Sequence, residues 1–114
     1  MEFVEQRAIY LQIADYICEK ILSKKWQAKE KIPSVRDMAV DIEVNPNTVV
    51  RTYGYLEDKG IIFKQRGIGY FVAKDGFDKV LNLKKQVFLQ QEVPKFFKTM
   101  ELLNLKIGDL YENQ

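Results

Sequence analysis

The sequence contains no histidine and only one cysteine. Histidine is the most common general base and metal ligand, so its absence removes the usual centre of acid–base catalysis. One cysteine without histidine cannot provide a zinc site. Phosphate-binding loops of the Gly-x-x-x-x-Gly-Lys-Ser/Thr form and Gly-x-Ser-x-Gly elbows are also missing. These absences argue against an enzyme, and we expect no metal and no other cofactor.

Long apolar runs are missing as well. No stretch approaches the roughly 18 apolar residues that a membrane-spanning helix needs. Residues 1–7 do not show the charged-then-apolar layout of a secretory signal. The lone Cys18 cannot form a disulfide within the chain, and a cytoplasmic protein without membrane contact is therefore the simplest expectation.

A large excess of one charge is also missing, because the 114 residues have a net charge of only +2. Global charge thus says little about partners. The distribution is more informative, since no acidic residue occurs between Lys59 and Lys74, whereas Lys64 and Arg66 add two more bases. Such a local basic strip is what phosphate contact requires.

Three helices are predicted in the first half of the chain. The isoleucines of residues 9–24 recur every four positions and give one apolar stripe. Ser34 starts a capping-box-like sequence after Pro33, which predicts a short helix over residues 34–42. A third helix over residues 46–58 has its own start and stop signals.

These signals are the N-cap Asn45, Pro46 at the first helical position, and Gly60 just after the last turn. The polar side of this third helix is expected to carry Asn47, Thr48 and Arg51. Gly54 lies in its middle, where it is either a close-approach position or a tolerated weakness.

Two β-rich runs, 61–65 and 70–73, follow the third helix. The connector 66–69 contains two glycines, which predicts a tight hairpin turn. Three helices and a hairpin in this order predict a mainly α fold with a small β-hairpin (α+β), a winged helix-turn-helix over residues 8–75. Trp26 and Cys18 are expected in its core, although Cys18 has redox sensing as an alternative.

Residues 76–114 are predicted to be helical, with Pro94 either kinking a helix or starting a new one. They are too few for a ligand-binding domain with its own core, and too apolar for a solvated tail. We therefore expect a dimerisation extension covered by a second copy of the chain. The expected interface comprises Phe77, Val80, Leu81, Phe88, Phe96, Phe97, Met100 and Leu103. The alternative for the phenylalanines is an effector pocket between protomers.

The chain resembles the GntR family of transcription regulators over about residues 8–75. The resemblance is carried mainly by Ile9-Tyr-Leu-Gln-Ile13, Lys31-Ile-Pro-Ser-Val-Arg36, Val44-Asn-Pro-Asn-Thr-Val49 and the hairpin Arg66-Gly-Ile-Gly-Tyr-Phe-Val72. The short helical extension is similar to that of the YtrA subfamily. The chain departs from the usual family sequence at three places. Ala8 replaces a frequent proline, residues 28–30 replace a common Pro-Gly-Glu turn, and Val50 replaces a frequent arginine.

The resemblance implies a homodimeric regulator, usually a repressor, that binds double-stranded DNA at an inverted repeat, a palindromic operator. A small-molecule effector would act by shifting the two DNA-binding units, although the sequence shows no clear pocket for it. The DNA contacts implied by the family are Ser34, Arg36, Asn45, Asn47, Thr48, Arg66, Gly67 and Gly69. The basic side chains themselves add Lys64 and Arg51.

Each of these contacts has an alternative. Val50 occupies a position where many family members have a DNA-contacting arginine, and Arg51 comes one residue later. Arg51 could bind a guanine, bind a phosphate, or be a solvated arginine, and Arg36 has the same alternatives. The hairpin over residues 61–73, called the wing below, could be an ordinary hairpin whose basic side chains are solvated and do not contact DNA. A winged-helix protein-interaction module that does not read DNA is the alternative for the whole chain.

Overall fold

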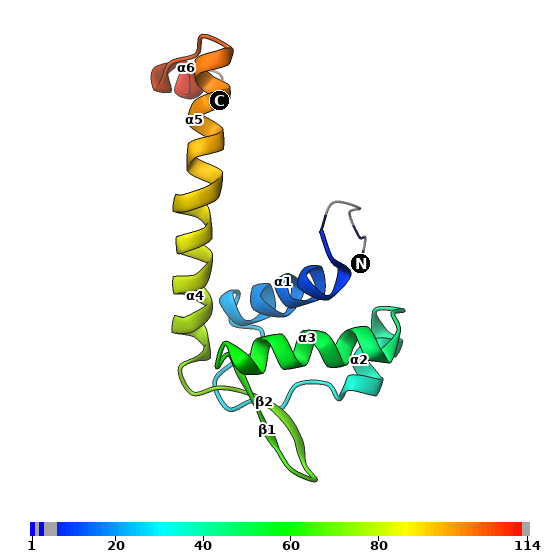
Figure 1. Ribbon diagram of the computed structural model, residues 1–114. Coiled ribbons are helices and arrows are strands. Elements are labelled where there is room, and N and C mark those ends of the chain that lie inside the picture. The colour runs from blue at the N-terminus through cyan, green and yellow to red at the C-terminus, as the bar shows by residue number, and fades with distance from the viewer. Residues whose placement is uncertain (2, 4–6, 113–114) are drawn as a thin grey trace. The chain divides into compact units, whose positions relative to one another are not determined.

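The computed structural model describes residues 1, 3 and 7–112. The chain forms two compact units, Met1–Leu81 and Asn82–Gln114. The first unit contains α1 (Ile9–Leu22), α2 (Val35–Asp41), α3 (Pro46–Asp58), β1 (Ile62–Gln65), β2 (Gly69–Val72) and the start of α4 (Gly76–Val87), as shown in Figure 1. The mostly helical fold with one two-stranded antiparallel sheet confirms the predicted fold class.

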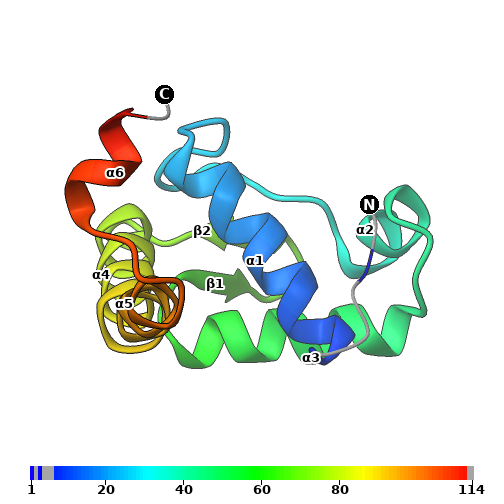
Figure 2. The same cartoon turned by 90° about the horizontal axis from the view of Figure 1, so that it is seen from above.

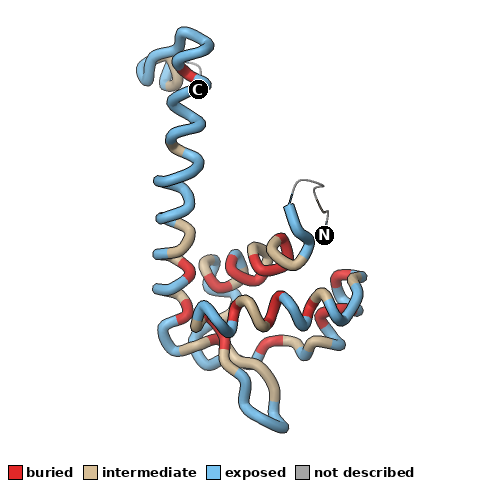
Figure 3. The backbone as a smooth tube through the Cα atoms, in the orientation of Figure 1, coloured by how far each residue is buried: buried red, intermediate tan, exposed pale blue. Residues whose placement is uncertain are grey.

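The core of the first unit lies between α1 and α3, which run side by side (Figures 1 and 2). Ile13, Ile17 and Ile21 are buried on α1, whereas Ile9 at its start is 46% exposed. Buried segments on α1 and α3 are visible in Figure 3. The four-residue spacing therefore identified the core face of α1, although the helix ends at Leu22, two residues earlier than predicted.

The helix starts use the residues that the sequence indicated. The Asp37 N–H donates to Ser34 Oγ at 3.1 Å and the Asn47 N–H donates to Asn45 Oδ1 at 2.8 Å. These bonds satisfy amides that a helix N-terminus leaves unpaired. Gly60 has φ +72°, which lets the chain turn away from α3.

The hairpin confirms the predicted wing. β1 and β2 are antiparallel, with Ile62 opposite Val72 and Gln65 opposite Gly69. The segment before α2 also pairs with β2, which the sequence did not indicate. The Ile32 N–H donates to the Tyr70 carbonyl at 3.0 Å, so the backbone that leads into α2 is fastened to the wing.

Trp26 is not a core residue, contrary to expectation, because its side chain is only partly buried. It lies after α1 and lines an open pocket of about 240 Å³ together with Ile21, Val72 and Phe77. Cys18 is 2% exposed, as expected of a small core residue. The core below the wing is thus closed by Ile61, Ile62 and Val72, which are all buried.

The second unit contains the rest of α4, a π-helical segment η1 (Phe88–Glu92), α5 (Val93–Leu102) and α6 (Ile107–Glu112). Pro94 lies in the first turn of α5, directly after η1. A proline has no N–H to give to the preceding turn, and a π-turn accommodates that loss without breaking the helix. Residues 113 and 114 of the predicted extension lie outside the described residues.

The division between the units falls at Leu81, whereas the sequence placed a boundary at residues 75 and 76. The reason is visible in α4, because Val80 is fully buried and belongs to the first unit. A Cβ on Gly76 would lie 2.9 Å from the Ile61 carbonyl, so the start of α4 packs closely on the strand region.

Two of the expected interface residues are unsuited to that role. Val80 is 0% exposed and Met100 is 6% exposed, so their side chains are buried within one chain and can add almost no area to a dimer interface. We therefore remove Val80 and Met100 from the expected dimer surface. Phe88, Phe96, Phe97 and Leu103 are between 46% and 63% exposed and remain available. Phe77 and Leu81 are partly buried.

Among the described residues, no helix is both long and apolar enough to pass through a membrane. The same residues contain no group of three or more histidine, cysteine, aspartate or glutamate side chains that could hold a metal ion.

Candidate nucleic-acid interface

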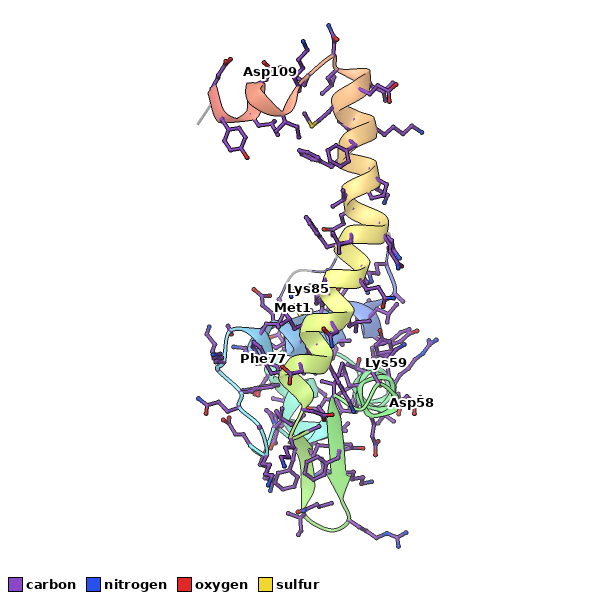
Figure 4. The ribbon with its side chains drawn as sticks, turned by 90° about the vertical axis from the view of Figure 1, so that its left-hand side faces the viewer. Met1, Asp58, Lys59, Phe77, Lys85 and Asp109 are labelled. Atoms are coloured by element: carbon purple, nitrogen blue, oxygen red, sulfur yellow. The ribbon has the colours of Figure 1, made fainter. Side chains whose placement is uncertain are left out.

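The outward face of α3 is the centre of the candidate interface. The inward face consists of Val49, Thr52, Tyr53 and Leu56, all of which are fully buried. Because successive helical residues are about 100° apart, the opposite face carries Asn47, Val50, Arg51 and Gly54. The acidic residues of α3 come only in its last turn, where Figure 4 shows Asp58 beside Lys59. The first turns of α3 can therefore approach an anion without repulsion.

Arg51 lies on the side of this face that is nearer to α1. Its guanidinium carbon is 3.9 Å from the centre of the Tyr10 ring, which is a close cation–π contact. Stacking holds the plane of the guanidinium while leaving its edge free to donate hydrogen bonds. The one-residue shift from Val50 to Arg51 thus still places an exposed arginine at the surface, and Tyr10 orients it.

Asn47, Thr48 and Arg51 line one groove of about 340 Å³ with residues 8–10 at the start of α1. Asn47 and Arg51 are exposed and Thr48 is partly exposed. The groove therefore brings three of the predicted contact residues together. Tyr10 was missed as a contributor, since it lies outside the isoleucine repeat of α1 and no sequence pattern indicated a cationic partner.

Two buried hydroxyls fix α3 in place. Thr52 Oγ1 donates to the Tyr10 carbonyl at 2.8 Å, which ties α3 to α1. The Tyr53 hydroxyl donates to the Pro33 carbonyl at 2.6 Å, which ties α3 to the segment before α2. Burial raises the pKa of the Tyr53 phenol well above its ordinary value, so the group keeps the proton that it donates.

Ser34 and Asn45 have structural duties as helix caps, and both are exposed. Their oxygens accept backbone hydrogen bonds, but the serine hydroxyl and the asparagine amide remain able to donate to a phosphate. Arg36 is exposed in the first turn of α2. Ser34 and Arg36 thus lie at the start of α2, and Asn45 lies at the start of α3.

The wing carries the second group of predicted contacts. Lys64 and Arg66 are exposed, with Lys64 Nζ 5.7 Å from the centre of the Tyr70 ring. Gly67 has φ +77° and Gly69 has φ +141°, conformations that other residues rarely adopt. The two glycines are therefore required by the turn itself, whatever else their small size permits.

Lys31 is a basic residue of this region that sequence reasoning did not single out. A Cβ on Gly69 would lie 3.0 Å from Lys31 Cε, so the lysine stem lies against the wing. Lys31 forms a β-bridge with Phe71 and is exposed. Its position just before Ile32-Pro33-Ser34 was the signal that could have identified it, because that segment leads into α2.

The comparisons with known proteins agree with this geometry. Residues 9–72 match the model of the family described as bacterial regulatory proteins, gntR family. The chain is 36% identical over 111 residues to the uncharacterized HTH-type transcriptional regulator YhcF of Bacillus subtilis (strain 168), covering 97% of this chain and 90% of YhcF. It is 35% identical over 83 residues to the HTH-type transcriptional repressor YtrA of the same organism, covering 73% of this chain and 64% of YtrA.

Among solved structures, the fold matches a putative transcriptional regulator of the GntR family from Bacteroides thetaiotaomicron with a TM-score of 0.75. The two chains are 43% identical, and the match covers 92% of this chain and 91% of the other. The match therefore spans nearly the whole of both chains. With α3, the wing and the family model in agreement, the chain belongs to the GntR family of DNA-binding transcription regulators, with YtrA-type relatives, and is not an enzyme.

Proposed function

We propose that this chain represses transcription as a homodimer that binds an inverted-repeat operator. The observation that carries the proposal is the exposed groove of Asn47, Thr48 and Arg51 on α3. The name of the YtrA relative, a repressor, supports the direction of regulation. Because bacterial DNA lies in the cytoplasm, we place the protein there.

In the proposed complex, α3 enters the major groove with its N-terminal turns. Asn47, Thr48 and Arg51 then face base edges or the neighbouring phosphates. Ser34, Arg36 and Asn45 bind phosphates beside the groove, where the amides at the helix starts also favour an anion. The phosphate contacts of α2 and α3 would thus set the position of α3 in the major groove. The residues of the groove on α3 would provide the sequence preference.

The wing contributes a second, electrostatic contact in the same proposal. Lys64 and Arg66 point a positive strip at the sugar–phosphate backbone, and Gly67 and Gly69 let the hairpin backbone approach it closely. Lys31 extends this strip from the side of the wing. Phosphate contacts of this kind hold the protein on DNA without selecting a sequence.

The second unit supplies the proposed dimer contact. Its described residues expose several large apolar side chains, of which the main ones are Phe88, Leu89, Phe96, Phe97, Leu102 and Leu103. An exposed apolar surface of this extent is a common sign of an interface. A second copy that covers it would be related by a two-fold axis, and an operator with matching symmetry follows. Phe77 and Leu81 would extend the contact.

The proposal includes regulation of DNA binding by a small molecule. An effector would act by changing the separation of the two DNA-binding units, since the operator fixes the distance between its half-sites.

The decisive experiment is selection of bound duplexes from a random pool by the purified protein. We expect an enriched inverted repeat with half-sites about one helical turn apart. Titrations of that duplex at several salt concentrations should show affinity falling steeply as salt rises. No enrichment, even at low ionic strength, would refute the proposal.

A further inference from the structure

Two residues on the outward face of α3 have no evident purpose in the fold. Val50 is 54% exposed, so its side chain contributes little to the core. A Cβ on Gly54 would meet no atom within 4 Å, so no close packing within the chain requires a glycine there. Valine and glycine are both weaker helix formers than alanine. α3 therefore carries two unfavourable residues at positions where the isolated chain gains nothing from them.

Val50 and Gly54 are four residues apart and hence lie on the same side of the helix, one turn above the other. Asn47 and Arg51 each lie three residues before one of them, so polar groups border the pair. Val50 and Gly54 therefore form an apolar strip of short side chains in the middle of the outward face of α3. In the proposed complex, this face enters the major groove. Only contact with something outside the chain would make use of this strip.

We propose that Val50 packs against the 5-methyl group of a thymine, and that Gly54 leaves the clearance that brings α3 close enough for this contact. The thymine methyl is the apolar group that base pairs present in the major groove, and apolar side chains are its usual partners. A side chain at position 54 would lift the next turn of the helix away from the bases. This inference rests on the proposed function and names one base that each half-site must contain.

The valine contact is tested with duplexes taken from the selection described above. Each thymine of the half-site is replaced in turn by deoxyuridine, which removes only the methyl group. For the unmodified protein, replacing the contacted thymine in a single half-site should weaken binding about fourfold, the value of one buried methyl-sized group. The same replacement should weaken the binding of Val50→Ala less, because the two valine methyl groups that contact the thymine methyl are then absent.

The glycine is tested by Gly54→Ala, with two readouts that should move in opposite senses. The melting temperature should rise by about 4–8 °C, because alanine is the better helix former and has free space at this position. Operator affinity should fall about tenfold, because the added methyl meets the DNA. The matched control is Gly108→Ala in α6, where a Cβ also meets nothing within 4 Å, and it should leave operator affinity unchanged.

The outcomes separate this inference from the function on which it rests. If the unmodified protein enriches no duplex, the proposed function fails. If it binds its operator but no deoxyuridine effect depends on Val50, the thymine contact is refuted. If Gly54→Ala binds as tightly as the unmodified protein, the clearance role is refuted.

Discussion

At the scale of single residues, buried polar groups hold the exposed ones in place. Thr52 and Tyr53 are neighbours in α3 and both are fully buried, yet each donates a hydrogen bond to a carbonyl of another segment. Their exposed neighbour Arg51 stacks on Tyr10, the residue whose carbonyl Thr52 binds. The position of the guanidinium is therefore set by both its ring partner and the helix that carries it.

Arg51→Ala should weaken operator binding by about 1–3 kcal/mol if the guanidinium reads a base. The melting temperature should change little, because the cation–π contact at an exposed site contributes only about 0.5–1 kcal/mol. Arg51→Lys distinguishes the two kinds of contact, since lysine keeps the charge for a phosphate but loses the fork that binds guanine. Affinity is measured by fluorescence anisotropy on the selected operator.

Lys25→Ala is the control for this variant, because it removes one exposed positive charge from the same unit. It should change affinity much less than Arg51→Ala does. A collapse of the melting transition in Arg51→Ala would show instead that Arg51 is a structural residue, and its assignment to the interface would then be wrong.

Tyr53→Phe should lower the free energy of unfolding at pH 7 by about 1 kcal/mol, because the hydrogen bond to the Pro33 carbonyl is lost. A second effect appears at alkaline pH. The pKa of this phenol is raised in the folded state, so above about pH 10 the unfolded chain releases a proton that the folded chain keeps. The stability contributed by the neutral phenol is thus complete below pH 10 and is lost as the pH rises.

The slope of that loss approaches about 1.4 kcal/mol per pH unit for one group. Urea unfolding of both proteins between pH 8 and pH 11 should therefore show their free energies converging above pH 10. Tyr111→Phe is the matched control, because that side chain is 72% exposed. Parallel curves for Tyr53→Phe and the unmodified protein would contradict the role given to this hydroxyl.

At the scale of elements, the wing is stiffened by a ring contact between its two strands and by a bridge to the segment before α2. Phe63 and Phe71 face each other across the strands with ring centres 5.5 Å apart, and Lys31 forms a bridge with Phe71. The exposed bases of the turn are thereby carried on a supported hairpin. An ordered hairpin loses less conformational freedom on binding than a mobile loop would.

Replacing both Lys64 and Arg66 by alanine should therefore reduce affinity for all duplexes, selected or random. Each phosphate contact removed lowers the slope of log K against log salt by about 1, so the double variant should lose about 2. The melting temperature should stay nearly constant, because both side chains are exposed. A control that replaces the exposed Lys25 and Lys95 removes the same charge elsewhere, and an equal loss of slope in that control would refute the wing contact.

At the scale of the whole molecule, the question is what covers the apolar side chains of the second unit. Phe88 and Phe96 are 52% and 46% exposed in one chain. Fully burying an exposed phenylalanine is worth about 1.5–3 kcal/mol, and about half of that remains to be gained at each of these half-exposed side chains. A second copy of the chain would recover that free energy and would also pair the two DNA-binding units.

Phe88→Asp combined with Phe96→Asp should give monomers in sedimentation equilibrium, because each change places a charge in the proposed apolar contact. Operator binding should weaken strongly, since a monomer holds only one half-site. Phe88→Leu with Phe96→Leu keeps the apolar character and should remain dimeric. A dimeric aspartate variant with normal helicity would show that the dimer contact lies elsewhere.

Local sequence determined the elements of this protein. The spacing of the isoleucines in α1, the caps Ser34 and Asn45, and the paired glycines of the wing all act over a few residues. Helix periodicity, capping and turn conformation are local physical effects, so each can be predicted from a short stretch of the sequence. The fold class follows from such local patterns, whereas most residues of the candidate interface were expected from the resemblance to the GntR family.

Tertiary structure decided what joins distant parts of the chain. Only folding shows that Arg51 stacks on Tyr10, that Tyr53 binds the carbonyl before α2, and that Lys31 lies on the wing. The structure also places Val80 in the core rather than at the expected dimer surface, and Trp26 at an open pocket rather than in the core. These outcomes depend on which surfaces meet after the elements pack, and packing is a property of the assembled chain rather than of any short stretch of it.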